Sequence, residues 1–120
     1  MRLLVLTLLL TAITLSITSH AHTGLTSSKP LAEQVLYTAI KELRLEFSTP
    51  VRLIQVKLLD NDGNPVELIA HQRTQADTVF RIPAPQLNAG SYTFKWIVMG
   101  GDTHKMTGSI PFTVAESSAQ

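Results

Sequence analysis

The stretch Gly101-Asp102-Thr103-His104-Lys105, near the end of the chain, carries the pair of side chains best suited to chemistry. Asp102 and His104 are two residues apart, and in an extended backbone residues at that spacing point to the same face. A carboxylate oxygen and an imidazole nitrogen would then lie within reach of one metal ion. Two donors are half of a four-coordinate site, so another part of the chain must complete it.

The other half of the predicted site is at the opposite end of the chain, where His22 directly follows Ala21. Cleavage after Ala21 would make His22 the first residue, with a free amine beside its imidazole. These two nitrogens can close a chelate ring around a metal. An α-amine has an ordinary pKa of about 7.7–8.0, so a metal can displace its proton near neutral pH. His71 lies in a polar loop and is expected to be solvated.

Three nitrogens and one oxygen in a plane suit the tetragonal preference of Cu(II), which also stands at the top of the affinity order for divalent metals. The donor set therefore ranks Cu(II) first, with one ion per chain. Zinc could use the same donors in a tetrahedral arrangement, and nickel is a further candidate. A plainer interpretation also exists, since an Asp-x-His pair in a loop is common and can simply satisfy the loop's own hydrogen bonds.

Residues 1–21 have the pattern of a secretory signal peptide. Arg2 gives a basic start, the run from Leu3 to Ile17 is almost entirely apolar, and small residues lead to Ala21. A transmembrane anchor is the alternative, but the apolar run is shorter than the roughly 20 residues that cross a bilayer. We therefore predict cleavage after Ala21 and a mature domain over residues 22–120. A cut shifted by a residue or two would remove the amine or bury it in a peptide bond.

Composition limits the mature chain to one small domain without covalent cross-links. Removing the signal leaves 99 of the 120 residues, with nine basic and nine acidic side chains because Arg2 is lost. A balanced charge does not favour nucleic acid or an anionic membrane as a partner. The chain has no cysteine, which excludes disulfides and a thiolate nucleophile. Packing alone must hold the fold.

Apolar and polar residues alternate with the period of β-strands in several short segments. The expected strands are His22–Ser28, Leu43–Phe47, Ile54–Leu58, Pro65–Ala70, Val79–Ile82, Tyr92–Met99 and Met106–Val114. Asp60-Asn61-Asp62-Gly63 predicts a hairpin turn. Residues 31–41 lack a helix-capping residue and are expected to form an irregular connection with about one helical turn.

The strand from Tyr92 to Met99 is expected at the centre of the core. Tyr92, Phe94, Trp96 and Val98 alternate along it and would share one face, the densest aromatic column in the sequence. About seven short strands at a spacing of roughly ten residues predict an all-β fold, either an immunoglobulin-like sandwich or a Greek-key barrel. Neither architecture names a function.

Several motifs follow one another along the mature chain. They are Ala21 before a mature His22, then Ser27-Ser28-Lys29-Pro30, Leu43-Arg44-Leu45-Glu46-Phe47-Ser48, Leu87-Asn88-Ala89-Gly90-Ser91-Tyr92, Trp96, Asp102-Thr103-His104 and Gly108-Ser109-Ile110-Pro111-Phe112-Thr113-Val114. Together they resemble the CopC family of periplasmic copper-binding proteins, in the same order and at similar spacing over essentially the whole mature chain.

The resemblance implies an immunoglobulin-like or cupredoxin-like β-barrel in which the amine and imidazole of His22 bind Cu(II) together with Asp102 and His104. It further implies a role in copper resistance in the bacterial periplasm, with an inner-membrane copper transporter of the CopD type as a partner. Two features depart from the family. The methionine-rich Cu(I) loop of some members is missing, and Thr49 stands where some members place a Glu close to Cu(II), so water would fill that position.

Two other functions stay open at this point. Oxidative polysaccharide-cleaving copper enzymes also hold copper through a terminal histidine, and a structural immunoglobulin-like module would use Asp102 and His104 only within their loop. The sequence shows neither a nucleophile triad nor paired carboxylates for acid–base catalysis. We therefore expect a binding protein rather than an enzyme, one that buffers copper or delivers it to a membrane partner. Neither nucleic acid nor, after loss of the signal, a lipid bilayer is expected as a partner.

Overall fold

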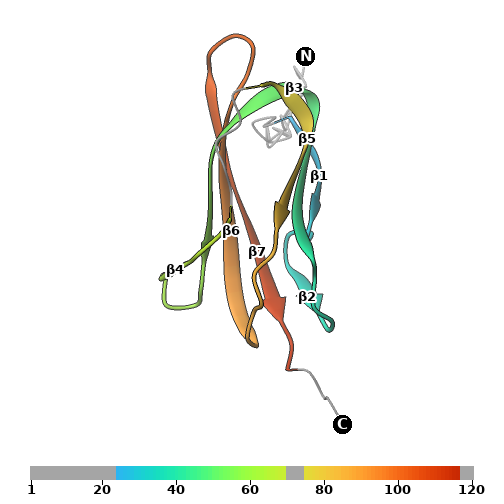
Figure 1. Cartoon of the computed structure of the whole chain (residues 1–120), viewed down its shortest axis with the longest axis vertical. Helices are drawn as coiled ribbons and strands as arrows, with labels where there is room; N and C mark the ends of the chain where they lie inside the picture. Colours follow the sequence, from blue (N-terminus) through green and yellow to red (C-terminus); the bar gives the residue numbers. More distant parts are fainter. Residues whose placement is uncertain (1–23, 70–74, 117–120) are drawn as a thin grey trace, which may run out of the picture.

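The computed structural model describes residues 24–69 and 75–116, and within these ranges it is all-β (Figure 1). The strands are β1 (Leu25–Lys29), β2 (Gln34–Leu36), β3 (Glu42–Leu59), β4 (Pro65–Val66), β5 (Asp77–Pro83), β6 (Gly90–Met99) and β7 (Lys105–Val114). These two ranges hold no helix long and apolar enough to span a membrane. The predicted signal peptide, His22 and His71 lie outside the described residues.

Strand β3 organises the fold because it belongs to two sheets. Its first half pairs antiparallel with β1 and β5, and its second half pairs antiparallel with β6 and β4. The two separate strands predicted at 43–47 and 54–58 are therefore one strand of 18 residues. Figure 1 shows it arching over one end of the molecule. The prediction divided it because Ser48-Thr49-Pro50 interrupts the apolar alternation at the bend.

The two sheets face each other across the core. We call sheet A the group of β1, residues 42–51 of β3, and β5; sheet B comprises residues 52–59 of β3 with β4, β6, β7 and β2. Strand β7 pairs antiparallel with β6 along its whole length and parallel with β2 at its end. The prediction of an all-β fold of about seven strands, either an immunoglobulin-like sandwich or a Greek-key barrel, is confirmed, with the strands in two facing sheets.

The core forms where the inward faces of the two sheets meet. Tyr92, Phe94, Trp96 and Val98 are all buried, as predicted from their alternation. Trp96 packs edge-on against Phe47 of sheet A, with ring centroids 5.2 Å apart and planes at 82°. This geometry suits the quadrupoles of aromatic rings and joins the two sheets at the middle of the molecule.

Trp96 also requires a glycine on the neighbouring strand. Gly108 is its register partner in β7. A Cβ atom built on Gly108 would overlap the indole atoms Cζ2 and Cε2, so the ring occupies the space of the missing side chain. The largest buried side chain of the core therefore depends on the smallest residue beside it.

Two segments differ from the predicted elements. Residues 34–36 form β2 instead of part of an irregular connection, and no helical turn is found in the described segment 31–41. Leu36 is buried, and Glu33 N donates a hydrogen bond to Pro111 O, so contacts with β7 decide this strand. The predicted strand from Pro65 is regular only to Val66. The hairpin turn at Asp60 is confirmed, with Gly63 N donating to Asp60 O at 3.0 Å.

Candidate metal centre

The loop between β6 and β7 holds the predicted pair, Asp102 and His104. Thr103 N donates to Gly100 O at 3.0 Å, and Gly100 N donates to His104 O at 3.1 Å. These two bonds close a three-residue hairpin loop with a left-handed residue at its end. That residue is Thr103, with φ of 67°. A β-branched side chain rarely adopts this conformation, so the loop stores roughly 1–3 kcal/mol of strain.

The carboxylate of Asp102 folds back over this turn and contacts His104 twice. Asp102 Oδ1 accepts a hydrogen bond from His104 N at 3.2 Å, and Asp102 Oδ2 lies 2.8 Å from His104 Nδ1. Gly100 makes room for the carboxylate, because a Cβ atom there would stand 3.0 Å from Asp102 Oδ1. Neither Gly100 nor Thr103 was predicted to shape this loop, although a Gly-Gly dipeptide such as Gly100-Gly101 is typical of a turn.

The prediction that Asp102 and His104 lie together is confirmed, but its stated reason is wrong. The prediction relied on extended backbone, in which residues two apart share a face. The structure brings the side chains together through a tight turn with Thr103 in a left-handed conformation. The turn draws the imidazole to the carboxylate, so the two groups form a hydrogen-bonded pair.

Electrostatics couples the two groups, although both are solvent-exposed, with 68% of the Asp102 side chain and 83% of the His104 side chain accessible. The hydrogen bond with His104 lowers the pKa of the Asp102 carboxyl. The same bond raises the pKa of the His104 imidazole, with a further contribution from the negative charge of Asp102. Because Nδ1 faces the carboxylate, Nε2 of His104 is the nitrogen that can bind a metal, as in other carboxylate-supported histidine ligands.

The pair is two donors and not a complete site. Among the described residues no group of three or more His, Cys, Asp or Glu side chains could hold a metal ion. His22, the predicted source of two further nitrogens, lies outside the described ranges. Donors beyond Asp102 and His104 would have to come from the segment that contains His22, from solvent or from another molecule.

The beginning of β1 lies at the same end of the sandwich as this loop. Gly24 O accepts a hydrogen bond from Ser48 N at 2.8 Å, at the bend of β3. Just past that bend, Arg52 pairs with Met99, the last residue of β6 before the loop. Figure 1 shows the β6–β7 loop and the β3 arch at one end of the molecule. The described chain therefore begins at the end of the fold that carries Asp102 and His104.

The two methionines beside the loop do not form a thioether site. Val98 is the register partner of Met106, and the buried residues of β6 alternate with Met99, so the two methionines lie on opposite faces of sheet B. Met99 Sδ contacts Nη2 of Arg52 at 3.3 Å. A guanidinium so close disfavours a second cation at that sulfur.

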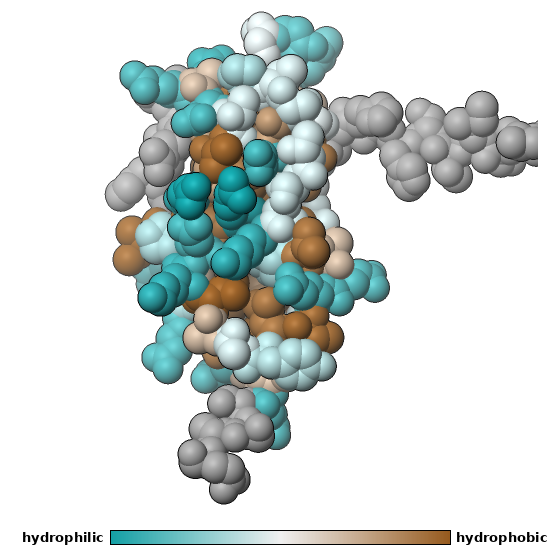
Figure 2. Space-filling view, turned by 90° about the vertical axis from the view of Figure 1, so that its right-hand side faces the viewer, coloured by the Kyte–Doolittle hydropathy of each residue, from teal (hydrophilic) through white to brown (hydrophobic). Residues whose placement is uncertain are grey.

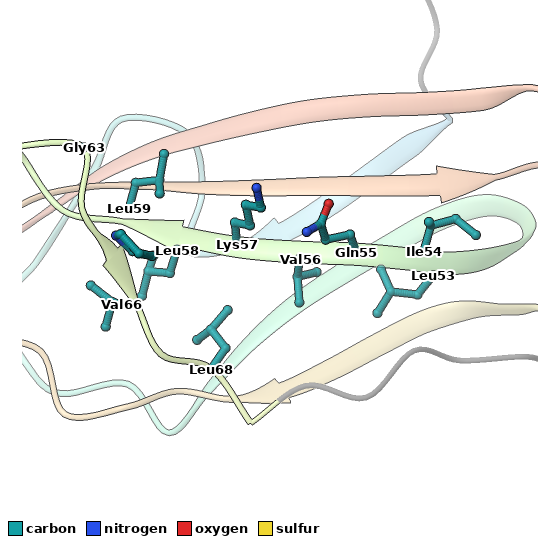
Figure 3. Close-up of a pocket in the computed structure, with 11 residues that line it drawn as sticks. Leu53, Ile54, Gln55, Val56, Lys57, Leu58, Leu59, Gly63, Val66 and Leu68 are labelled. Carbon is teal, nitrogen blue, oxygen red and sulfur yellow. The ribbon is translucent and has the colours of Figure 1, made fainter.

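An apolar hollow of about 730 Å³ lies elsewhere, along the second half of β3 and β4 (Figure 3). Its lining includes Leu53, Val56, Val66 and Leu68, and neither Asp102 nor His104 belongs to it. Aliphatic side chains are not metal donors, so this hollow is separate from the candidate metal centre.

Comparison with known proteins shows that this chain is similar to copper resistance proteins. A family model described as the CopC domain matches residues 25–115. Copper resistance protein C of Pseudomonas syringae pv. tomato is 30% identical in an alignment 117 residues long, which covers 90% of this chain and 92% of that protein.

Two solved structures share the fold. CopC from Methylosinus trichosporium OB3b superposes with a TM-score of 0.66 at 25% identity, over 80% of this chain and 95% of that one. PcoC, a methionine-rich copper resistance protein from Escherichia coli, gives 0.59 at 29% identity, over 75% and 95%. Both superpositions agree with the all-β sandwich described above.

Proposed function

This chain belongs to the CopC family, and from that membership we propose that it is an exported protein that binds one Cu(II) ion and buffers or delivers it without turnover. In this proposal residues 1–21 are a signal peptide cleaved after Ala21, and residues 22–120 are the copper-binding domain of the bacterial periplasm. The proposed ligands are the amine and imidazole of His22, the carboxylate of Asp102 and the imidazole of His104.

One observation carries the proposal: the hydrogen-bonded pair of Asp102 and His104 at the end of the sandwich where β1 begins. His104 can present Nε2, and Asp102 retains lone pairs that can face a metal. A mature terminus at His22, two residues before Gly24, would add two nitrogens from that same end. The resulting three nitrogens and one oxygen are the donor set that Cu(II) prefers.

The decisive experiment changes only the position of the terminal amine. Mature protein starting at His22, with its first residue verified by mass spectrometry, is titrated with Cu(II) in competition with a chelator and followed by electron paramagnetic resonance. A second protein carries one extra Gly before His22, and a matched control carries one extra Gly after Gln120. We expect the N-terminal extension to weaken Cu(II) binding by orders of magnitude and the C-terminal extension to leave it unchanged. Equal affinity in all three proteins contradicts the proposed ligand set.

The absence of turnover is tested separately. We propose that bound copper is passed on, with a membrane copper transporter of the CopD type as the receiving partner. Copper-loaded protein incubated with a reductant and chitin or cellulose is expected to release no oxidised sugars. Their appearance would replace the binding function with an oxidative enzyme of the terminal-histidine class.

A further inference from the structure

The two sheets differ in charge. The strands of sheet A carry three basic and three acidic residues: Lys29, Arg44, Arg81, Glu42, Glu46 and Asp77. The strands of sheet B carry four basic residues and no acidic one: Arg52, Lys57, Lys95 and Lys105. Figure 2 views the molecule from the side of sheet A, where hydrophilic residues cover the middle of the face. Although the whole chain is nearly neutral, every charged residue on the strands of sheet B is therefore basic.

The four cations of sheet B share its outer face. Cross-strand register sets Arg52, Met99 and Lys105 in one row beside the metal-centre loop, and Lys57, Lys95 and Ser109 in a second row farther along the sheet. Figure 3 shows Lys57 and Gln55 on one side of β3, with Leu53 and Val56 on the other. All four basic side chains belong to exposed residues. They form a flat patch that reaches the Asp102–His104 loop through Lys105.

None of these four cations forms an ion pair with a described acidic residue. The ion pairs found in the described ranges are Arg44–Glu46 at 3.2 Å and Arg81–Glu42 at 3.1 Å, both on sheet A, and the loop pair Asp102–His104. On sheet B, Lys57 stands directly opposite Lys95. Like charges in register across two strands destabilise a sheet, so this arrangement works against the stability of the isolated domain.

A shallow hollow of about 460 Å³ lies on the same face. Gln55, Lys57, Lys95, Thr107 and Ser109 supply amide, ammonium and hydroxyl groups around it, and Ile97 adds an apolar surface. The amide and hydroxyl groups can donate hydrogen bonds and the two ammonium groups add positive charge, which suits carboxylate side chains. The apolar surface of Ile97 suits the methylene groups that carry those carboxylates.

We propose that the outer face of β3, β6 and β7 in sheet B is a docking surface for an acidic patch on a partner protein. The inference rests on the proposed function, because a partner seated there lies beside the Asp102–His104 loop and can exchange copper with it. Uniform positive charge steers an acidic surface to this side of the molecule and leaves the mixed-charge sheet A free.

A protein fits this face better than an anionic lipid surface. Proteins that lie on membranes combine basic residues with exposed apolar side chains that insert between the lipids. The exposed large hydrophobic residues found in the described ranges are Leu31, Val35, Tyr37 and Ile69, and none of them belongs to β3, β6 or β7. Ile97 and Met99 on the basic face are partly buried.

The test uses poly-L-glutamate as the probe of an acidic protein surface and phosphatidylglycerol vesicles as the probe of a lipid. The variant Lys57→Glu/Lys95→Glu reverses two charges on sheet B. The control Lys29→Glu/Lys41→Glu reverses the same charge at two exposed lysines outside it. Binding is measured by fluorescence anisotropy, and amide chemical shifts of the mature protein locate the contact.

We expect the sheet B variant to bind poly-L-glutamate about tenfold more weakly and the control to stay within about twofold of the unaltered protein. Shifts should centre on β3, β6 and β7. Equal losses in both variants, or a preference for the vesicles, would overturn the docking surface.

Titrating Cu(II) into the same variants separates this inference from the proposed function. Both variants should keep the Cu(II) affinity of the unaltered protein. If unaltered protein fails to bind Cu(II) yet docks poly-L-glutamate on sheet B, the proposed function fails while the docking surface stands. If Cu(II) binds normally but the probe shows no preference for sheet B, the docking surface alone is rejected.

Discussion

Strands β6 and β7 hold the centre of the fold at one point and the candidate metal centre at their end. In the middle, Trp96 is 2% exposed and lies across Gly108. At the end, the side chains of Asp102 and His104 are 68% and 83% exposed. Within this one hairpin, the buried middle stabilises the fold and the exposed end carries the candidate metal donors. Substitutions in the middle should change unfolding, and substitutions in the loop should change metal binding.

The largest effect is expected at the buried point. Trp96→Ala should lower the free energy of unfolding by roughly 3–5 kcal/mol, because it removes the ring that joins the two sheets. Chemical denaturation monitored by circular dichroism measures this. The folded fraction should still bind Cu(II), since the strand partners of Trp96 are Val56 and Gly108 and not residues of the loop.

Trp96→Phe is the control for this prediction. The indole Nε1 has no hydrogen-bond partner among the described residues, so the substitution forfeits packing but no hydrogen bond there. It should lose clearly less stability than Trp96→Ala. Equal losses would show that the ring's volume is not what holds the sheets together.

A smaller loss is expected when the strand beside Trp96 gains a methyl group. Gly108→Ala places Cβ in the space of the indole ring and should destabilise the fold by about 1–3 kcal/mol through overpacking. Gly101→Ala is the matched control, because a Cβ there meets nothing within 4 Å. Thermal unfolding of both variants tests the contrast, and similar melting temperatures would contradict it.

At the loop we expect the opposite effect of a substitution, namely a gain in stability. Thr103→Gly removes a β-branched residue from a left-handed conformation and should stabilise the metal-free protein by about 1 kcal/mol. The loop should hold its carboxylate and imidazole less firmly, so Cu(II) affinity should fall. Thr107→Gly, at an exposed position of β7, is the control and should lose stability instead. A destabilised Thr103→Gly protein would show that the left-handed residue is not strained.

The smallest effect concerns titration of the loop pair in the metal-free protein. His104 should titrate above its ordinary pKa of 6.5 because Asp102 accepts its hydrogen bond, and Asp102→Asn should bring that pKa down. The stabilisation from a raised histidine pKa is present below the unfolded pKa and disappears as the pH rises through the folded pKa. For the lowered pKa of Asp102, the stabilisation disappears as the pH falls through the folded pKa. NMR shifts of the imidazole protons, recorded against pH for the unaltered protein and for Asp102→Asn, measure the pKa of His104. Identical titration curves would mean that the pair does not form in solution.

The fold was predicted well wherever one face of a strand is buried. The alternation from Tyr92 to Val98 specified a buried column, and the structure confirms it. The pattern failed for β2, whose three residues are too few to show a period and which forms through pairing with β7. It also failed at the β3 bend, where polar residues interrupt a strand that continues.

The candidate site was predicted in part. The types and spacing of Asp102 and His104 identified a pair that the structure brings to 2.8 Å. The role of His22 stays a prediction, as does its joining with this pair. The basic face of sheet B was invisible in the sequence, because balanced totals of charge conceal how strand register distributes them.

The sequence by itself determined the class of fold and the donor types, since strand periodicity and side-chain chemistry are local properties of the chain. Only the tertiary structure decided that β3 serves two sheets, that a left-handed turn rather than extended backbone pairs Asp102 with His104, and that four cations share one face. These depend on contacts between residues far apart along the chain, which local pattern does not encode. Register and packing fix them, and both arise only when the two sheets close on a common core.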